Sequence, residues 1–200
     1  MARIKIGEAT TDSNGVATFT YEGTGAGKLN VRAEYGTLLS ETYEVFDTLF
    51  YDKGHSGTDG VDYNSTGWTN ARCTLTRDTE TKLVWDGTSN NGAYYRSFTL
   101  NDGLCIEFDI NFVKNSSSHD IFNIEQNWTV LGNMTKSNCG LAENTWHHIQ
   151  IEMQGANGTI KNDTNDTVIS FDCTGADRFL FSLRHSNDVI MYKNFKIYSI

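Results

Sequence analysis

The feature that most constrains this chain is the alternation of apolar and polar residues with a period of two in short runs. In the segment GLCIEFDINF, Ile106, Phe108 and Ile110 alternate with Glu107 and Asp109. Because successive side chains of a β-strand point to opposite faces, the apolar residues are expected to face a core and the carboxylates the polar side. Similar runs recur along the chain, and no segment has a convincing helical period. The alternation therefore predicts an all-β fold.

Composition supports the same fold class and excludes several partners. The 200 residues include 24 Thr, 19 Asn and 18 Gly, and no Pro; Thr favours strands, while Asn and Gly favour turns. The net charge of −9 comes with no cluster of Lys and Arg, so binding to nucleic acid is not expected. No apolar run approaches the ~18 residues that span a bilayer, so membrane insertion is not expected either.

Residues 48–200 contain twelve candidate strands, which together predict two antiparallel sheets packed face to face. A turn-rich loop without periodicity, GHSGTDGVDYNSTGW, follows the first of them. The candidate strands cover residues 49–51, 72–76, 82–85, 93–99, 104–113, 120–124, 129–131, 146–154, 158–161, 167–172, 179–184 and 189–200.

The first 47 residues read as four short strands, at 3–6, 16–21, 28–35 and 38–46, separated by turn residues. Their sequence TTDSNGVATFTYEGTGAGKLNVRAEYG resembles the closing half of a bacterial Ig-like repeat of the intimin and invasin type. In that family a D-x-N-G turn leads into a V/A-x-F-x-Y strand. The match covers about half of a usual repeat, so residues 1–47 are expected to form a partial Ig-like spacer.

Three later segments resemble the concanavalin A-like lectin and glucanase superfamily, which includes laminin-G-like domains. GLCIEFDINF looks like an inner strand of that jelly roll, ENTWHHIQIEM like a strand that follows a turn, and DVIMYKNFKIYSI like the last strand. The resemblance implies a jelly-roll domain over residues 48–200. The predicted fold is thus a short Ig-like β-sandwich fragment followed by an antiparallel β-sandwich jelly roll.

Motifs for catalysis are weak. Glu107 and Asp109 share one strand face, as in the E-x-D-x-x-E motif of laminarinase-type enzymes, but Phe112 occupies the position of the second catalytic glutamate. His147 and His148 are adjacent, so they face opposite sides of a strand and cannot act on one substrate together. No catalytic residue is assigned, and the chain is expected not to be an enzyme.

Carbohydrate binding requires aromatic rings that stack on sugars and polar side chains that bond to hydroxyl groups. Three clusters at strand ends offer both, and Trp128 is the preferred aromatic residue because its polar neighbours predict exposure. Trp85 and one of Tyr94 or Tyr95 have an alternative interpretation as core residues, because adjacent tyrosines of a strand point to opposite faces, and the same alternative applies to Trp128. The expected ligand-binding residues are Trp128, Asn127, Glu125, Trp85, Tyr95, Arg184, His185 and Asn187.

Calcium is a second expectation, because carboxylate oxygens are the ligands this ion prefers. Asp52, Asp59 and Asp62 lie close together in sequence, and Asp188 is expected to approach them from the last strand. The segment has no calcium loop of fixed spacing. The alternative to a calcium site is that these aspartates are solvated loop residues without a ligand.

Cys73, Cys105, Cys139 and Cys173 have neither the C-x-x-C spacing nor the histidines of a zinc site. Two disulfides or buried free thiols both fit the sequence. Seven N-x-S/T sequons occur, and one of them includes Asn127, so a glycan there would lie beside Trp128.

These observations predict a module that recognises a cell-surface polysaccharide or glycoprotein, at the end of a viral tail-fibre or receptor-binding protein or of a surface adhesin. Such a protein would act outside the cell or on the virion surface, and fibre proteins of this kind are commonly homotrimers. The amino-terminal segment lacks the apolar region of a signal peptide, which favours the virion. The alternatives are a glycan depolymerase, with Asp86 or Glu125 acting with Asp188, and a structural or capsid-decoration module.

Overall fold

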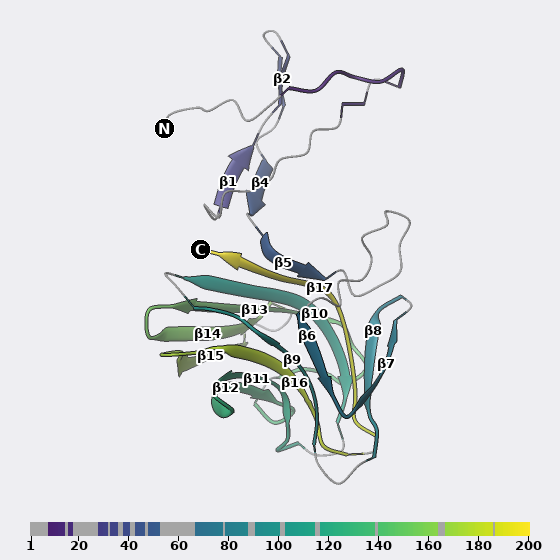
Figure 1. The fold of residues 1–200 in the computed structure, drawn as a ribbon, viewed down its shortest axis with the longest axis vertical. Coiled ribbons are helices and arrows are strands. Elements are labelled where there is room, and N and C mark those ends of the chain that lie inside the picture. Colours follow the sequence, from purple (N-terminus) through teal and green to yellow (C-terminus); the bar gives the residue numbers. More distant parts are fainter. Residues whose placement is uncertain are drawn as a thin grey trace.

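The computed structural model shows an all-β chain, drawn in Figure 1. It describes residues 8–14, 16–17, 28–31, 33–35, 38–40, 43–46, 48–52, 67–77, 79–87, 91–100, 103–114, 117–138, 140–163, 167–185 and 187–200. Within these ranges there is no helix, and hence none long and apolar enough to cross a membrane.

The larger of two main sheets has eight strands, in the order β15-β14-β13-β10-β17-β8-β7, and β5 also pairs with β17. All the pairings are antiparallel. The strands are β5 (Thr48–Asp52), β7 (Cys73–Arg77), β8 (Thr81–Trp85), β10 (Leu104–Val113), β13 (His147–Gln154), β14 (Asn157–Asn162), β15 (Thr167–Asp172) and β17 (Val189–Ser199).

The second sheet has five antiparallel strands in the order β12-β11-β16-β9-β6. They are β6 (Trp68–Ala71), β9 (Gly92–Ser97), β11 (Asp120–Gln126), β12 (Thr129–Thr135) and β16 (Arg178–Leu183). Figure 1 shows this sheet packed against the curved larger sheet, which confirms the predicted sandwich of two antiparallel sheets.

Aromatic rings fill the space between the sheets. The Trp68 ring of β6 stacks on Tyr94 at 4.6 Å between centroids and contacts Phe195 of the opposite sheet at 4.8 Å. Phe108 of β10 packs edge-on against Phe179 of β16 at 5.2 Å. These rings come from both sheets, so burying them fixes which face of each strand points inward.

The alternation predicted for β10 is confirmed residue by residue. Ile106, Phe108 and Ile110 are fully buried in the core, while Glu107 and Asp109 lie on the outer face of the larger sheet. All twelve strands expected after residue 48 are present within a few residues of their predicted ends. The sequence does not predict the thirteenth strand, β6, whose first residue, Trp68, ends the turn-rich loop, because the residues around Trp68 show no alternation.

The amino-terminal part contains two small sheets among its described residues. β1 (Lys28–Val31) pairs with β4 (Tyr43–Phe46), and β2 (Glu34–Tyr35) pairs with β3 (Leu38–Leu39). The predicted D-x-N-G turn is held by the Asp12 carboxylate, which accepts hydrogen bonds from the backbone N–H groups of Asn14 and Val16. The predicted strands at 3–6 and over most of 16–21 lie outside the described residues.

Three cysteines, Cys73, Cys105 and Cys173, are buried as free thiols, and Cys139 lies outside the described residues. Burial raises the pKa of the Cys73 and Cys105 thiols to about 12. Since the thiolate is the reactive form, these three thiols should resist iodoacetamide at pH 8 in the native protein and react fully in urea. Mass spectrometry of labelled peptides measures this, and rapid native labelling of Cys73 or Cys105 would contradict it.

Candidate functional site

The tip of the β11–β12 hairpin holds an exposed tryptophan in a strained conformation. Asn127 and Trp128 form a two-residue loop with φ values of 46° and 69°, the positive values that a type I′ turn requires at both positions. Asn tolerates this region, but a bulky residue there is an outlier that costs about 1–2 kcal/mol. Trp128 is nevertheless 59% exposed, so core packing does not explain its presence.

Two side chains from neighbouring strands support the Trp128 ring. The Arg178 guanidinium of β16 lies 3.8 Å from the ring centroid, within the range of a cation–π contact. The Tyr95 ring of β9 meets Trp128 edge-on, with centroids 5.3 Å apart. The indole is therefore held in place while much of its surface stays open to solvent.

Beneath Trp128 lies a buried polar layer. Glu125 and Arg178 are paired across β11 and β16, and their Oε2 and Nη1 atoms are 3.7 Å apart, too far for a hydrogen bond. The Asn123 side-chain amide donates to Glu125 Oε1 at 3.5 Å. Burial raises the pKa of Glu125, although Asn123 and Arg178 oppose the shift.

The structure brings together four of the predicted ligand residues, Trp128, Asn127, Glu125 and Tyr95, and adds Arg178. We call these five residues the Trp128 site. Trp85 does not join them. It lies at the end of β8 in the larger sheet, opposite Cys73, and packs against the hydrophobic core. The alternative core interpretation therefore holds for Trp85.

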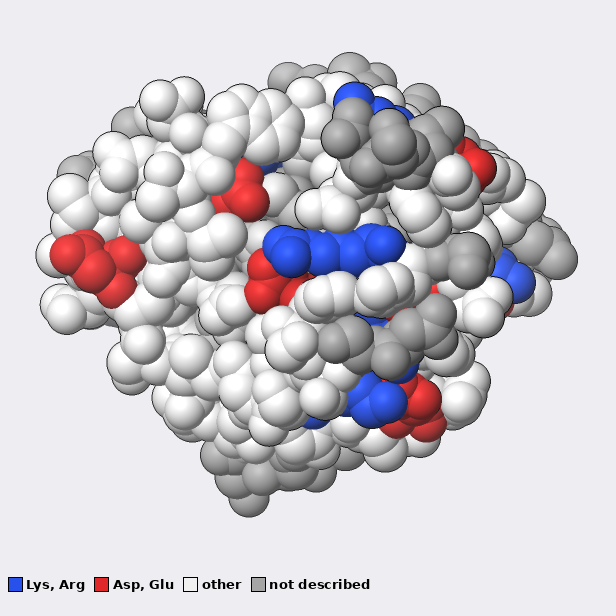
Figure 2. Space-filling view, turned by 90° about the horizontal axis from the view of Figure 1, so that it is seen from below, with Lys and Arg blue, Asp and Glu red and all other residues white. Residues whose placement is uncertain are grey.

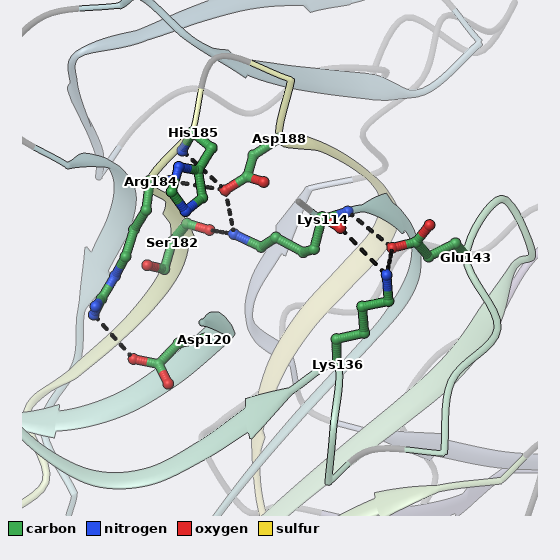
Figure 3. Close-up of polar contacts among 8 residues, drawn as sticks. All are labelled: Lys114, Asp120, Lys136, Glu143, Ser182, Arg184, His185 and Asp188. Carbon is green, nitrogen blue, oxygen red and sulfur yellow. Dashed lines mark hydrogen bonds and ion pairs between the residues drawn. The ribbon is translucent and has the colours of Figure 1, made fainter. Parts of the chain in front are cut away.

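The predicted residues Arg184 and His185 form a second cluster just beyond the end of β16 (Figure 3). Arg184 Nη2 donates to Asp120 Oδ2 at 3.3 Å, and the backbone N–H groups of Arg184 and His185 donate to Asp188. Asn187 is exposed beside them. Arg184 is six residues after Arg178, so this cluster lies about 20 Å along the sheet from the Trp128 site.

The two described members of the expected calcium set do not come together. Asp52 is opposite Phe195 in the β5–β17 pair, whereas Asp188 precedes the first residue of β17, so about 23 Å of strand separates them. Asp52 pairs with Arg77 at 3.2 Å, and Asp188 pairs with buried Lys114 at 3.2 Å. Each already neutralises a cation and does not fit a calcium site; Asp59 and Asp62 lie outside the described residues.

The Glu107 and Asp109 carboxylates are held by partners on the outer face of the larger sheet. Glu107 accepts hydrogen bonds from Lys196 at 2.6 Å and from Tyr198, and Asp109 accepts from His148 at 2.9 Å. Burial alone would raise the pKa of each carboxyl, but these partners outweigh it and hold both values below the ordinary range. Neither group is tuned to act as a catalytic acid at neutral pH.

The lowered pKa of Asp109 predicts a pH-dependent contribution to stability. A carboxyl with a lowered native pKa stabilises the fold above its unfolded pKa of about 4, and this contribution is lost as the pH falls through the native value. Asp109→Asn should therefore destabilise the protein at pH 7, and the difference from the parent should shrink toward pH 3. Urea unfolding at both pH values measures the free energy of unfolding of the variant and the parent. A difference that is the same at pH 7 and pH 3 would contradict the prediction.

The carboxylate pair Glu125 and Asp188, considered for hydrolysis, is not brought together. Glu125 lies opposite Arg178 at the start of β16, and Asp188 binds the backbone N–H of Arg184, beyond its end. The strand between them spans about 20 Å. Glycosidase carboxyl pairs lie about 5–9.5 Å apart, so this pair cannot flank one glycosidic bond.

Sequence reasoning missed Arg178, Asn123 and Asp177. Asp177 Oδ2 accepts the Asn127 backbone N–H at 3.1 Å and so holds the hairpin tip in place. The available signal was that Asp177 and Arg178 come directly before the strand predicted at 179–184, and ligand sites gather at strand ends. Their position beside β11 depends on a strand pairing across more than fifty residues, which the sequence pattern does not reveal.

No protein-family model and no curated protein matches the chain. Among solved structures, a sialidase is similar at 11% identity and a TM-score of 0.53, covering 67% of this chain and 17% of that one. A CBM66 carbohydrate-binding module from Bacillus subtilis has a TM-score of 0.45 at 14% identity, covering 68% and 98%. The VIP36 exoplasmic/lumenal domain has a TM-score of 0.47 at 9% identity, covering 74% and 90%. The sialidase likeness supports the β-sandwich fold, and this chain corresponds to a small part of that protein.

Proposed function

We propose that this chain recognises a glycan through the Trp128 site. The observation that carries the proposal is the exposed tryptophan at a turn position where its φ of 69° is unfavourable. Strained residues of this kind cluster at ligand sites, where the surrounding structure holds them. An aromatic ring backed by a guanidinium and a carboxylate provides both a stacking surface and hydrogen-bonding groups for a sugar.

The setting we propose is the terminal binding module of a viral tail-fibre or receptor-binding protein, or of a surface adhesin, acting outside the cell or on the virion. Support comes from the Ig-like resemblance of residues 10–45, since a spacer followed by a binding module is the layout of such proteins. A homotrimer is the expected assembly in the fibre version. A partner on a cell surface would be a polysaccharide or glycoprotein.

A glycan array and a host cell-envelope binding assay test the proposal, with reducing-sugar release followed in the same samples. Saturable binding without sugar release is expected, and Trp128→Ala should abolish it. Trp146→Ala is the matched control, because Trp146 also lies under a cation, Lys193 at 4.3 Å, but directly before β13 of the larger sheet. Equal loss in both variants, or release of sugar, would contradict the proposal.

Glycosylation of Asn127 should block the site. Asn127 is exposed at the hairpin tip and heads the sequon Asn-Trp-Thr, so a glycan attached during secretion from yeast would lie beside the indole. Protein made in this way should lose binding, and Thr129→Ala should restore it by removing the sequon. Thr159→Ala, which removes the exposed sequon at Asn157 on β14, is the control and should restore nothing.

Calcium binding is a separate proposal that rests on Asp59 and Asp62. Thermal unfolding of the full chain before and after chelation tests it directly. A fall in Tm that calcium reverses would support it, and an unchanged Tm would contradict it.

A further inference from the structure

A row of polar side chains extends from the Trp128 site to Arg184 along the outer face of the smaller sheet. Arg178, at the start of β16, lies opposite Glu125 of β11, and Arg184, just beyond the end of β16, donates to Asp120 at the start of β11. Between them, Asn123 of β11 is opposite Asn133 of β12, and Asn133 donates to Asp120 at 2.6 Å. We call this row the polar strip; its members are Arg178, Glu125, Asn123, Asn133, Asp120 and Arg184.

Unsatisfied polar atoms are concentrated along the strip. In the described part of the chain, ten buried side-chain nitrogen and oxygen atoms have no hydrogen-bond partner, and seven of them lie on the strip or at its ends. Glu125, with a side chain only 6% exposed, contributes one of them. The seven atoms are Asn123 Oδ1, Glu125 Oε2, Asp177 Oδ1, Arg178 Nε and Nη1, Arg184 Nε and His119 Nδ1.

Buried polar atoms without partners are costly, and a concentration of them calls for a partner that the free chain does not supply. At the Arg184 end, the His119 ring stacks on His185 with centroids 4.6 Å apart, so an aromatic surface is present there as well. Both ends of the strip thus combine flat rings with unpaired donors or acceptors. That arrangement suits an extended ligand with groups that both donate and accept.

The charge of the strip distinguishes between kinds of glycan. Two guanidinium groups, Arg178 and Arg184, balance two carboxylates, Glu125 and Asp120, so the strip has no net formal charge, and Asp177 beside its Trp128 end adds one negative charge. Figure 2 shows a face on which basic side chains stand beside acidic ones among uncharged residues, rather than in a patch of one sign. With a net charge of −9 on the whole chain, an acidic glycan would be repelled.

Building on the proposed function, we infer that the ligand is a neutral, linear glycan that lies along β16 and contacts both the Trp128 site and the Arg184 end. Its hydroxyl groups bond to the members of the strip that are partly exposed, Arg178, Asn133 and Arg184. The strip is about 20 Å long, so a monosaccharide or disaccharide reaches one end only.

Calorimetric titration with neutral gluco-, xylo- and manno-oligosaccharides, from the disaccharide upward, tests this inference. Affinity should rise with chain length, level off once the strip is spanned, and change little with salt. Arg184→Gln should weaken the longest oligosaccharides about tenfold and leave the shortest unchanged, because short chains bind at the Trp128 end. His185→Ala is a second test at the same end of the strip, and it should also weaken only the longest oligosaccharides. Lys193→Gln, on the larger sheet, is the control and should leave every affinity unchanged.

The outcomes separate this inference from the proposed function. If binding requires Trp128 but is independent of chain length, or Arg184→Gln affects all lengths equally, the lengthwise arrangement is wrong and the Trp128 site stands. If only glycans bearing carboxylate or sulfate bind, and salt weakens their binding, the inference that the ligand is neutral is wrong. If no glycan binds in any series, the proposed function fails as well.

Discussion

Trp128→Gly is expected to abolish glycan binding while leaving the protein folded with nearly its parental stability. Loss of a central aromatic anchor typically costs at least ~2 kcal/mol, or about 30-fold in affinity. The stability of the variant reflects two opposing effects. Glycine at this φ of 69° relieves about 1–2 kcal/mol of backbone strain, which offsets the lost contacts with Arg178 and Tyr95, and Asn-Gly is the preferred sequence for a type I′ turn.

The comparison with Trp128→Ala provides the control. Alanine loses the same contacts as glycine but keeps the left-handed strain, so it should be less stable than the glycine variant by about 1 kcal/mol. Calorimetric titration measures binding and urea unfolding measures stability. Retained binding in Trp128→Gly would remove the basis of the proposed function, and an alanine variant at least as stable as the glycine variant would contradict the argument from strain.

Asp188→Ala is expected to be the most destabilising of the variants considered. The Lys114 and Asp188 side chains are both fully buried, and Lys114 Nζ also donates to the Ser182 carbonyl. Removing one partner of a buried ion pair leaves an uncompensated charge, which typically costs about 3–5 kcal/mol. Urea unfolding should show a loss of this size, and the loss should be the same in EDTA and in calcium.

Two further variants separate charge from hydrogen bonding. Asp188→Asn keeps an acceptor for the backbone N–H groups of Arg184 and His185 but removes the charge. It should therefore lose less stability than Asp188→Ala. The double variant Lys114→Met with Asp188→Asn removes both charges and should recover much of that loss. A loss that appears only with calcium present would show that Asp188 acts as a metal ligand instead.

The strands were predictable because their signal is local. In β10 the alternation of Ile106, Phe108 and Ile110 with Glu107 and Asp109 lies within ten consecutive residues. The three apolar side chains all face the core, so the pattern identifies the buried face of the strand. β6 was missed for the opposite reason. Of its residues Trp68 supplies most of the core contact, and a single buried ring produces no period that a sequence can reveal.

Only part of the Trp128 site was predictable from the sequence, and there is a physical reason why the rest was not. The exposure of Trp128 follows from its polar neighbours in sequence, and Asn127 already indicates a turn. The placement of Arg178 over the indole follows from the β11–β16 pairing, which joins distant segments. The ion pair of Asp188 with Lys114 was not predictable for the same reason, since the two residues are distant in sequence.

The most direct test of the central claim is the NMR spectrum of the indole N–H groups during titration with the tightest-binding neutral oligosaccharide. The chain has four tryptophans, at positions 68, 85, 128 and 146, so each signal can be assigned by single substitution. The account predicts a large saturable shift of the Trp128 signal, while the Trp68, Trp85 and Trp146 signals stay in place. Saturable binding that moves the Trp146 or Trp85 signal and leaves Trp128 unchanged would contradict it.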